Sequence, residues 1–260
     1  MIVFLFLLIS LNFLPECAAE YNLATGKEET VLFGTAKEVK LGRSIAKKIE
    51  KKFGLSKDVQ LQERLEQIGQ RLVSVCDRKD IVYCFRVLED EKVNAFSLPG
   101  GYVYANTGLI EEAESDDELA GVLAHEIGHI VARHSVKRLQ TALGYNLISM
   151  LALAVTRDAR FKRGADLAFA QIMQGYSRED EFLADELAVR YVQEAGYRPE
   201  AVISFLEKLR QIEKEKPLRP LIPSWVRSHP YLPERIAAAR QRVYGKMDFD
   251  DYINRREEGR

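Results

Sequence analysis

Apolar residues recur at helical spacing over much of the chain. Between residues 37 and 52 they stand among lysines at intervals typical of an amphipathic helix with one solvated face. Residues 61–75 repeat the pattern and predict a second helix. Towards the C-terminus, residues 177–196 and 201–212 predict two more helices, and a last one is expected to begin near Pro233.

The middle of the chain has the pattern of short strands instead. Residues 81–88 are rich in β-forming side chains, residues 93–97 are a second candidate, and residues 102–106 follow a Pro-Gly-Gly turn as a third. Ser115 then opens a Ser-Asp-Asp-Glu capping box, which marks the start of another helix. We therefore expect an α+β fold: a predominantly helical single domain with a small β-sheet.

The N-terminus resembles a secretory signal. Residues 2–14 are apolar with small polar breaks, and the sequence Cys17-Ala18-Ala19 that follows suits cleavage after Ala19. We expect residues 1–19 to be a signal peptide and residues 20–260 to be the functional domain, located in the periplasm or cell envelope. Cys17 offers an alternative, a lipidated N-terminus, and an uncut segment would be an anchor.

Composition narrows the range of partners. The chain has 260 residues, of which 47% are apolar, and a formal net charge of −1, so it suits one globular domain and gives no electrostatic reason to expect nucleic acid. Residues 139–155 are the longest internal apolar stretch, with basic flanks. They predict a buried helix or, alternatively, a peripheral contact with an anionic membrane surface. Cys76 and Cys84 form either a disulfide or two separate thiols.

The chemistry is concentrated around residue 125. The chain has four histidines, and three of them lie between residues 125 and 134. His125 and His129, in the sequence His-Glu-Ile-Gly-His, stand one helical turn apart on one face, so both imidazoles can reach one tetrahedral zinc ion. Glu126 is placed beside them to take a proton from a metal-bound water. This spacing predicts the helix of a zinc peptidase.

A catalytic zinc site needs a third protein ligand. Glu181 and Asp185 form an i, i+4 pair on a later helix. Glu181 is the predicted ligand, and Asp185 is expected to hydrogen-bond the distal nitrogen of a liganding histidine. The alternative for these acids is a solvated acidic face. His134, five residues after His129, is interpreted as a surface or helix-capping histidine.

The fourth histidine is His229, on a loop just before the last predicted helix. A histidine on the opposite side of the metal would stabilise a tetrahedral oxyanion, so His229 is a second catalytic candidate. Arg235 is expected to orient His229 or to balance the buried acids. The alternative is a plain surface loop.

These motifs carry a family resemblance. HEIGHIVARHS, SREDEFLADELAVRYVQEAGY and SHPYLPERI resemble the gluzincin metallopeptidases related to the CAAX prenyl proteases, HtpX and BepA, and NAFSLPGGYVYANTGLI resembles the strand segment before their zinc helix. The chain is most similar to the soluble periplasmic or lipoprotein branch, over most of residues 90–240. The resemblance implies a zincin with an active-site HExxH helix. It also implies one zinc ion held by His125, His129 and Glu181, with Glu126 as general base and Asp185 supporting a ligand.

The resemblance also implies a substrate site. The segment from Gly100 to Asn106 would be an exposed edge strand that aligns an extended peptide by backbone pairing. The substrate-binding candidates are Asn94, Gly100, Gly101, Tyr102, Val103 and Tyr104. His229 would act in transition-state stabilisation or, in a latent state, occupy the open zinc position. We expect a zinc-dependent endopeptidase that cleaves unfolded or misassembled proteins in the cell envelope. The alternative is a zinc-binding chaperone or adaptor for envelope protein assembly with little or no proteolysis.

Overall fold

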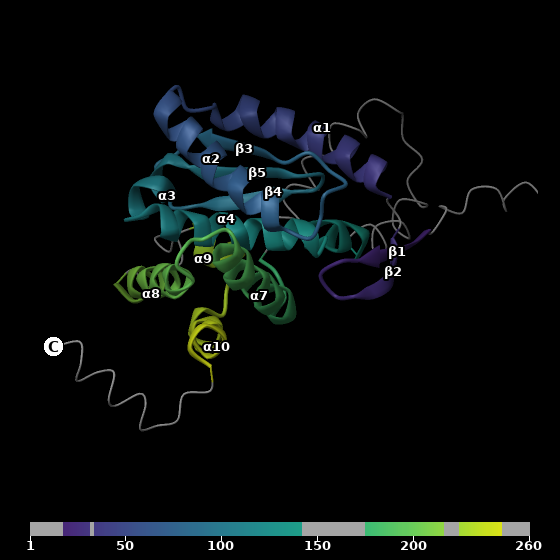
Figure 1. Cartoon of the computed structure of the whole chain (residues 1–260). Helices are drawn as coiled ribbons and strands as arrows, with labels where there is room; N and C mark the ends of the chain where they lie inside the picture. The colour runs from purple at the N-terminus through teal and green to yellow at the C-terminus, as the bar shows by residue number, and fades with distance from the viewer. Residues whose placement is uncertain (1–17, 32–33, 142–174, 216–223, 246–260) are drawn as a thin grey trace, which may run out of the picture.

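The structure, a computed structural model, describes residues 18–31, 34–141, 175–215 and 224–245 (Figure 1). Its elements follow in chain order: β1 (Ala18–Asn22), β2 (Lys27–Val31), α1 (Thr35–Phe53), α2 (Val59–Val75), β3 (Cys84–Leu88), β4 (Ala95–Leu98), β5 (Tyr102–Asn106), α3 (Thr107–Glu112), α4 (Asp116–Val131), α7 (Arg178–Glu194), α8 (Glu200–Glu215), α9 (Ser224–Ser228) and α10 (Leu232–Tyr244). Helices predominate around a small sheet, which confirms the predicted fold class.

The main sheet has the strand order β3-β5-β4. β5 pairs in parallel with β3 and antiparallel with β4, so it is the central strand. The expectation that Gly100 to Asn106 form an exposed edge was therefore wrong. Gly100 (φ 78°) and Gly101 (φ 97°) make the tight turn that returns β5 alongside β4. β3 then occupies the other side of β5, so β3 and β4 are the two edge strands of this sheet.

Helices cover both faces of this sheet. On one face α1 places Ile45 and Ile49 in a cluster with Phe96 and Tyr104. On the other face α2 and α4 pack against Phe85 and the other strand residues that point that way. Figure 1 shows α1 above the strands and α4 below them. This arrangement buries α4 between the sheet and the C-terminal helices.

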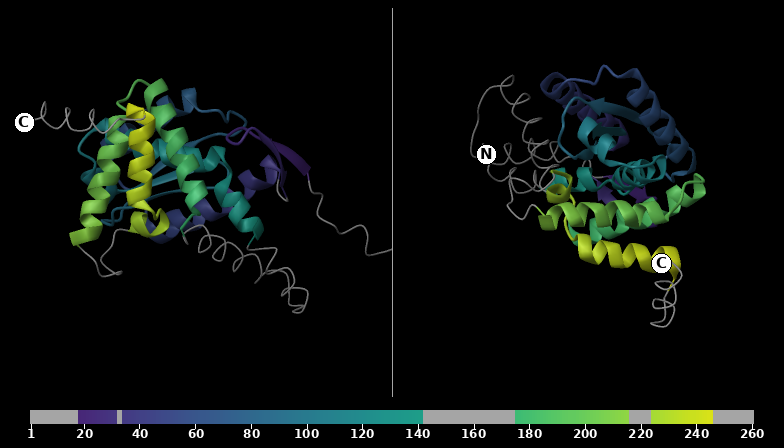
Figure 2. Two further views of the ribbon diagram at one scale, coloured as in Figure 1. Left: turned by 90° about the horizontal axis from the view of Figure 1, so that it is seen from below. Right: turned by 90° about the vertical axis from the view of Figure 1, so that its left-hand side faces the viewer.

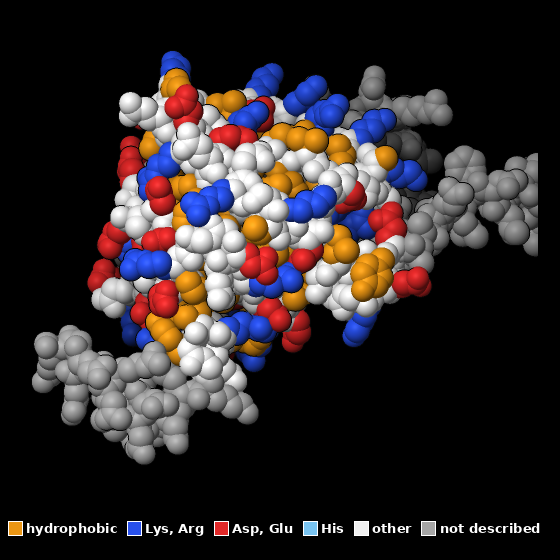
Figure 3. All heavy atoms as spheres, viewed as in Figure 1, with side chains coloured by type: hydrophobic (Ala, Val, Ile, Leu, Met, Phe, Trp, Pro, Cys, Tyr) orange, Lys and Arg blue, Asp and Glu red, His pale blue; other side chains and the backbone are white. Residues whose placement is uncertain are grey.

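The C-terminal helices form a further layer on α4. The two views in Figure 2 show α7, α8 and α10 packed side by side, with α10 next to both of the others. The α4–α7 contact is close because α4 has glycine at position 128. A Cβ atom there would lie 3.0 Å from the carbonyl oxygen of Ala184 on α7. Figure 3 shows charges of both signs mixed over one face of the molecule, in keeping with the small net charge.

Most predicted elements are present within one to three residues of their expected ends. The capping box differs: Ser115 accepts from the Glu118 backbone N–H, but the Glu118 carboxylate accepts from the backbone of Glu114 rather than that of Ser115. Trp225 lies in the short helix α9. Cys76 and Cys84 are free thiols.

The predicted leader and apolar stretch fall largely outside the described residues. Ala18 and Ala19 begin β1, and residues 1–17 are not described. Of residues 139–155, the first three are helical and Leu139 is buried in the α1 cluster. The membrane contact therefore stays a prediction. In the described part of the chain, no helix has both the length and the apolar character needed to span a bilayer.

Candidate metal centre

The HExxH residues lie in the most buried part of α4. Ser115 caps the helix, and the acids of the first turn complement its dipole. From Leu119 onward every residue of α4 is buried, His125, Glu126 and His129 included. Helical spacing places His125 Nε2 and His129 Nε2 only 3.0 Å apart. The two nitrogens therefore face one common point.

Glu181 reaches the same point from the first turn of α7. A capping box of Ser177 and Asp180 fixes the start of this helix. The Glu181 side chain is fully buried, 3.5 Å from His125 Nε2 and 3.6 Å from His129 Nε2. The alternative of a solvated acidic face is thus excluded for this residue.

His229 brings a fourth ligand atom. Its Nδ1 lies 3.1 Å from His125 Nε2 and 3.0 Å from Glu181 Oε1. The candidate ligand atoms of the two α4 histidines, Glu181 and His229 all lie within 4.8 Å of one another. With His229 only 1% exposed, a plain surface loop is excluded.

The donor set fits one metal ion. Ligand nitrogens around a tetrahedral zinc ion stand about 3.3 Å apart, as follows from zinc–nitrogen distances of about 2.0–2.1 Å. The three imidazoles converge at 3.0–3.1 Å. Glu181 Oε2 is buried and accepts no hydrogen bond among the described residues, although it forms an ion pair with Arg235. A cation would satisfy the converging lone pairs that burial otherwise leaves unpaired.

Arg235 and Asp185 support the ligands from behind. Asp185 Oδ1 lies 2.8 Å from His125 Nδ1, and its carboxylate accepts two bonds of 2.7 Å from the fully buried Arg235. Arg235 also donates to the His229 carbonyl oxygen at 3.1 Å. Burial alone would raise the pKa of Asp185 and of Glu181, but the guanidinium charge holds both below their usual values. Both acids therefore stay ionised beside the metal position.

Glu126 faces the other side of His229. Its Oε1 lies 3.3 Å from His229 Nε2 and accepts from Trp225 Nε1 at 3.3 Å. Its Oε2 has no hydrogen-bond partner among the described residues. The Trp225 ring stacks on His229 with centroids 4.6 Å apart. Trp225 was not among the predicted site residues, because nothing in the sequence around it indicates a contact with the zinc-binding motif.

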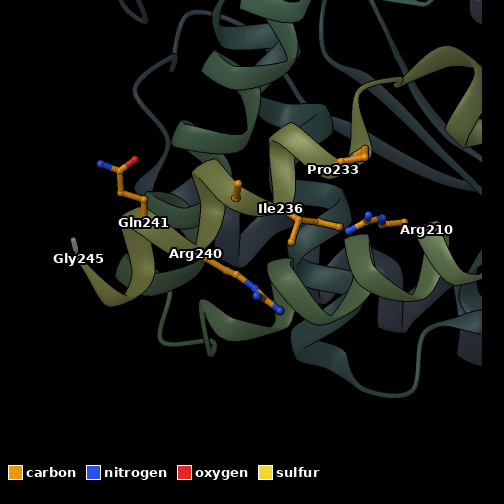
Figure 4. A pocket seen from close by; sticks show the side chains of 7 residues that line it. Arg210, Pro233, Ile236, Arg240, Gln241 and Gly245 are labelled. Atoms are coloured by element: carbon orange, nitrogen blue, oxygen red, sulfur yellow. The ribbon is translucent and has the colours of Figure 1, made fainter. Parts of the chain in front are cut away.

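The cavity beside His125, bordered by Asp185, Trp225 and Arg235 among others, measures about 10 Å³. That is room for about one water molecule. A larger surface cavity lies between α8 and α10, and its lining, with Arg210, Ile236 and Arg240, includes no candidate ligand (Figure 4). Glu126 lines neither of these two cavities.

His134 was misinterpreted. It is 2% exposed, and its Nδ1 lies 2.8 Å from His129 Nδ1, so it is neither a surface nor a capping residue. The reason is a break after α4, where Arg133 has φ 58° and a new helical segment begins at residue 134. This break turns His134 back onto His129. Tyr176, also missed, stacks on the His129 ring with centroids 3.9 Å apart.

The predicted substrate-binding residues do not join this cluster. Gly100 N–H donates to Glu38 Oε1 at 3.0 Å, and the Tyr104 hydroxyl donates to Glu50 at 2.9 Å. The backbone of β5, which contains Tyr102, Val103 and Tyr104, is paired on both sides. Asn94 precedes the edge strand β4 and is buried, with no hydrogen-bond partner for its Oδ1 among the described residues.

The geometry is that of a metallopeptidase of the HExxH class, with the third ligand a glutamate from a second helix. Comparison with known proteins identifies the particular group: the chain belongs to peptidase family M48, whose family model matches residues 59–243.

Individual relatives agree with this assignment. The chain is 27% identical to the beta-barrel assembly-enhancing protease of Escherichia coli (strain K12) over 85% of its own length and 46% of the relative. It is 29% identical to the putative beta-barrel assembly-enhancing protease of Vibrio cholerae over 72% of the chain and 40% of the relative. Mitochondrial metalloendopeptidase OMA1 of Saccharomyces cerevisiae is 32% identical over 47% of the chain and 35% of the relative. The chain thus spans less than half the length of these relatives.

Proposed function

We propose that this protein is a zinc endopeptidase of the cell envelope that cleaves unfolded or misassembled proteins. The observation that carries the proposal is the convergence of His125, His129 and Glu181 beside a glutamate, Glu126, that has a free carboxylate oxygen. Two imidazoles and one carboxylate favour zinc over harder divalent ions. The names of the bacterial relatives, which refer to β-barrel assembly, support an envelope substrate, as does the predicted leader.

The residues divide the chemistry between them. A bound zinc ion would lower the pKa of its water ligand to roughly 7 and polarise a carbonyl group. Glu126 would act as the general base, taking a proton from the attacking water on Oε2 and passing it to the leaving amine. His229, once displaced from the ligand set, presents its imidazole to the oxyanion. Asp185 and Arg235 keep the ligands oriented throughout.

The position of His229 supports a latent form of this enzyme. Its Nδ1 lies within 4.8 Å of the other three candidate ligand atoms, so it would occupy the fourth ligand position of a bound zinc ion. Activation therefore requires movement of the segment that carries His229 and Trp225. Neither residue is on a long helix, since α9 spans only Ser224–Ser228.

Substrates bind in extended form along β4. This strand pairs with β5 on one side and with no other strand among the described residues on its second side. It also packs beside α4. Backbone pairing with an edge strand tolerates many sequences, which suits an enzyme that acts on unfolded proteins.

The direct test is Glu126→Gln. This variant should bind one zinc ion as the wild type does and cleave casein about 10²–10⁴-fold more slowly, because it lacks the general base. Glu118→Gln, the same change in the first turn of α4, is the control and should cleave normally. Wild-type cleavage by Glu126→Gln would disprove the mechanism. If the variant still promoted folding of envelope proteins, the chaperone alternative would be favoured.

His229→Ala tests the latent form. Removal of the imidazole should leave the other three ligands and zinc in place while opening the fourth position. Cleavage of casein faster than by the wild type would show that blocking of the site by His229 outweighs its contact with the oxyanion, and slower cleavage would show the reverse. Measuring zinc content alongside cleavage separates the outcomes. A variant that loses zinc together with activity would show that His229 is a permanent ligand.

A further inference from the structure

We propose that His134 is a positioning residue which, together with Asp180, holds the ligand His129 in its metal-binding tautomer. This inference rests on the metal site proposed above but concerns a residue outside its ligand set. Three groups stand in series: His129 Nδ1 lies 2.8 Å from His134 Nδ1, and His134 Nε2 lies 3.3 Å from Asp180 Oδ1.

Only one placement of the imidazole hydrogens is consistent with these three contacts. His129 Nε2 faces His125 and Glu181, so it is the ligand atom, and a metal-binding nitrogen carries no hydrogen. The hydrogen of neutral His129 is then on Nδ1 and is donated to His134 Nδ1. His134 must then carry its own hydrogen on Nε2, the nitrogen that lies 3.3 Å from the negatively charged Asp180 carboxylate.

The opposite arrangement fails at both ends. If His134 donated from Nδ1, His129 would carry its hydrogen on Nε2 and could not bind metal. The bare Nε2 of His134 would then face the Asp180 carboxylate, which has no hydrogen to donate when ionised. Asp180 therefore selects the competent tautomer of His129 through His134.

The side chains packed around His129 and His134 hold the two rings in this arrangement. His129 and His134 are buried, at 0% and 2% exposure, so water does not replace a lost partner without cost. Tyr176 stacks on His129 and touches the His134 ring, with centroids 6.0 Å apart. The ring of His129 is thus fixed both in plane and in tautomer.

Each α4 histidine accordingly has its own acid on α7. Asp185 bonds directly to His125 Nδ1, whereas Asp180 acts on His129 through an intervening imidazole. These two acids flank the ligand Glu181 in sequence. The helix α7 therefore supplies one ligand and also orients the two histidine ligands of α4. Second partners of this kind contribute about 10–100-fold to metal affinity.

The experiment measures zinc dissociation constants by competition with a chelator in the full chain. His134→Leu should weaken zinc binding by about 10–100-fold. His134→Asn should restore most of that loss, because an amide oxygen takes the place of the accepting Nδ1. Asp180→Ala, at a partly exposed position that tolerates truncation, should weaken binding by a smaller factor. Ser177→Ala, which removes only the capping partner of Asp180, should lower Tm and leave zinc affinity unchanged.

The tautomers of His129 and His134 can be measured independently of peptidase activity. Long-range ¹H–¹⁵N spectra of the imidazoles should show His134 protonated on Nε2 and His129 on Nδ1 in the zinc-loaded protein. His134 protonated on Nδ1, or unchanged zinc affinity in folded His134→Leu and Asp180→Ala, would overturn the inference. A protein whose zinc affinity depends on His134 but which cleaves nothing would overturn the proposed peptidase and leave this inference standing.

Discussion

The metal centre is built from two regions of different construction. His125, His129 and Glu181 lie on long, buried helices whose ends are capped and whose contact is fixed by a glycine. His229 lies on a bend after a five-residue helix, and the next helix begins after Tyr231, which has φ 69°. The first region, α4 with α7, is called the ligand scaffold here, and the second, residues 224–235, the closing segment.

This difference fits the proposed roles, in which the scaffold residues are permanent ligands and His229 is a removable one. In the ligand scaffold all three candidate ligands lie on α4 or α7, and each has a partner behind it: Asp185 for His125, His134 for His129 and Arg235 for Glu181. In the closing segment His229 is held by aromatic stacking on Trp225 and by Arg235, which donates to its carbonyl oxygen. Arg235 is the charged connection between the two regions, since it also binds Glu181 and Asp185.

The largest loss of stability should come from removing the guanidinium of Arg235. Arg235→Met leaves two buried carboxylates without their cation and should destabilise the metal-free protein by about 3–5 kcal/mol, measured by denaturant unfolding. Arg240→Met on the same helix breaks a half-exposed pair with Glu207 and should cost no more than about 1 kcal/mol. Equal losses in the two variants would show that Arg235 does not join the regions.

A smaller effect should follow from separating the two helices of the scaffold. Gly128→Ala places a Cβ atom 3.0–3.1 Å from the backbone of Ala184, so α7 and its ligand Glu181 must shift. Destabilisation of about 1–3 kcal/mol and weaker zinc binding are expected. Gly121→Ala, also in α4, meets a Val202 side-chain atom at 3.3 Å and is the control. Calorimetry measures the stability and the zinc affinity of both variants. Unchanged zinc binding in Gly128→Ala would contradict the idea that close packing of α4 on α7 positions Glu181.

The smallest effect concerns pH at the far end of α4. Burial would raise the pKa of Glu118, but bonds from Lys208, the Glu114 backbone and Ser204 hold it below its ordinary value of 4.5. Its contribution is therefore complete above pH 4.5 and is lost as pH falls through the folded-state pKa. Glu118→Gln should remove this part of the acid destabilisation, less than about 1 kcal/mol, in unfolding curves between pH 6 and pH 3. An identical pH slope in the variant would exclude the assignment.

The ligand scaffold could be predicted from the sequence because the spacing of residues along a helix determines which side chains lie on the same face. The i, i+4 pairs of His125 with His129 and of Glu181 with Asp185 fix which side chains share a face, whatever the rest of the chain does. The structure does bring the predicted ligands together. Their roles in binding zinc stay predictions that the variants above test.

The features that were missed depend on contacts distant in sequence. His134 reaches His129 only because Arg133 adopts a positive φ, and Arg133 is held there by buried bonds to Glu38 and by Thr35. No local pattern encodes such a turn at a non-glycine residue. The edge position predicted for Gly100 to Asn106 was wrong for a similar reason. Alternation of side chains identifies a strand but does not tell which neighbours it pairs with.

The two ligand helices are far apart along the chain, with α4 ending at Val131 and α7 beginning at Arg178. A zinc ion bound by His129 and Glu181 therefore closes a large loop, much as a disulfide would. The entropy of closing a loop grows only with the logarithm of its length, about 0.6 kcal/mol for each doubling. Insertions between the two helices should consequently cost little stability, so this connection can acquire new sequence while the metal centre is preserved.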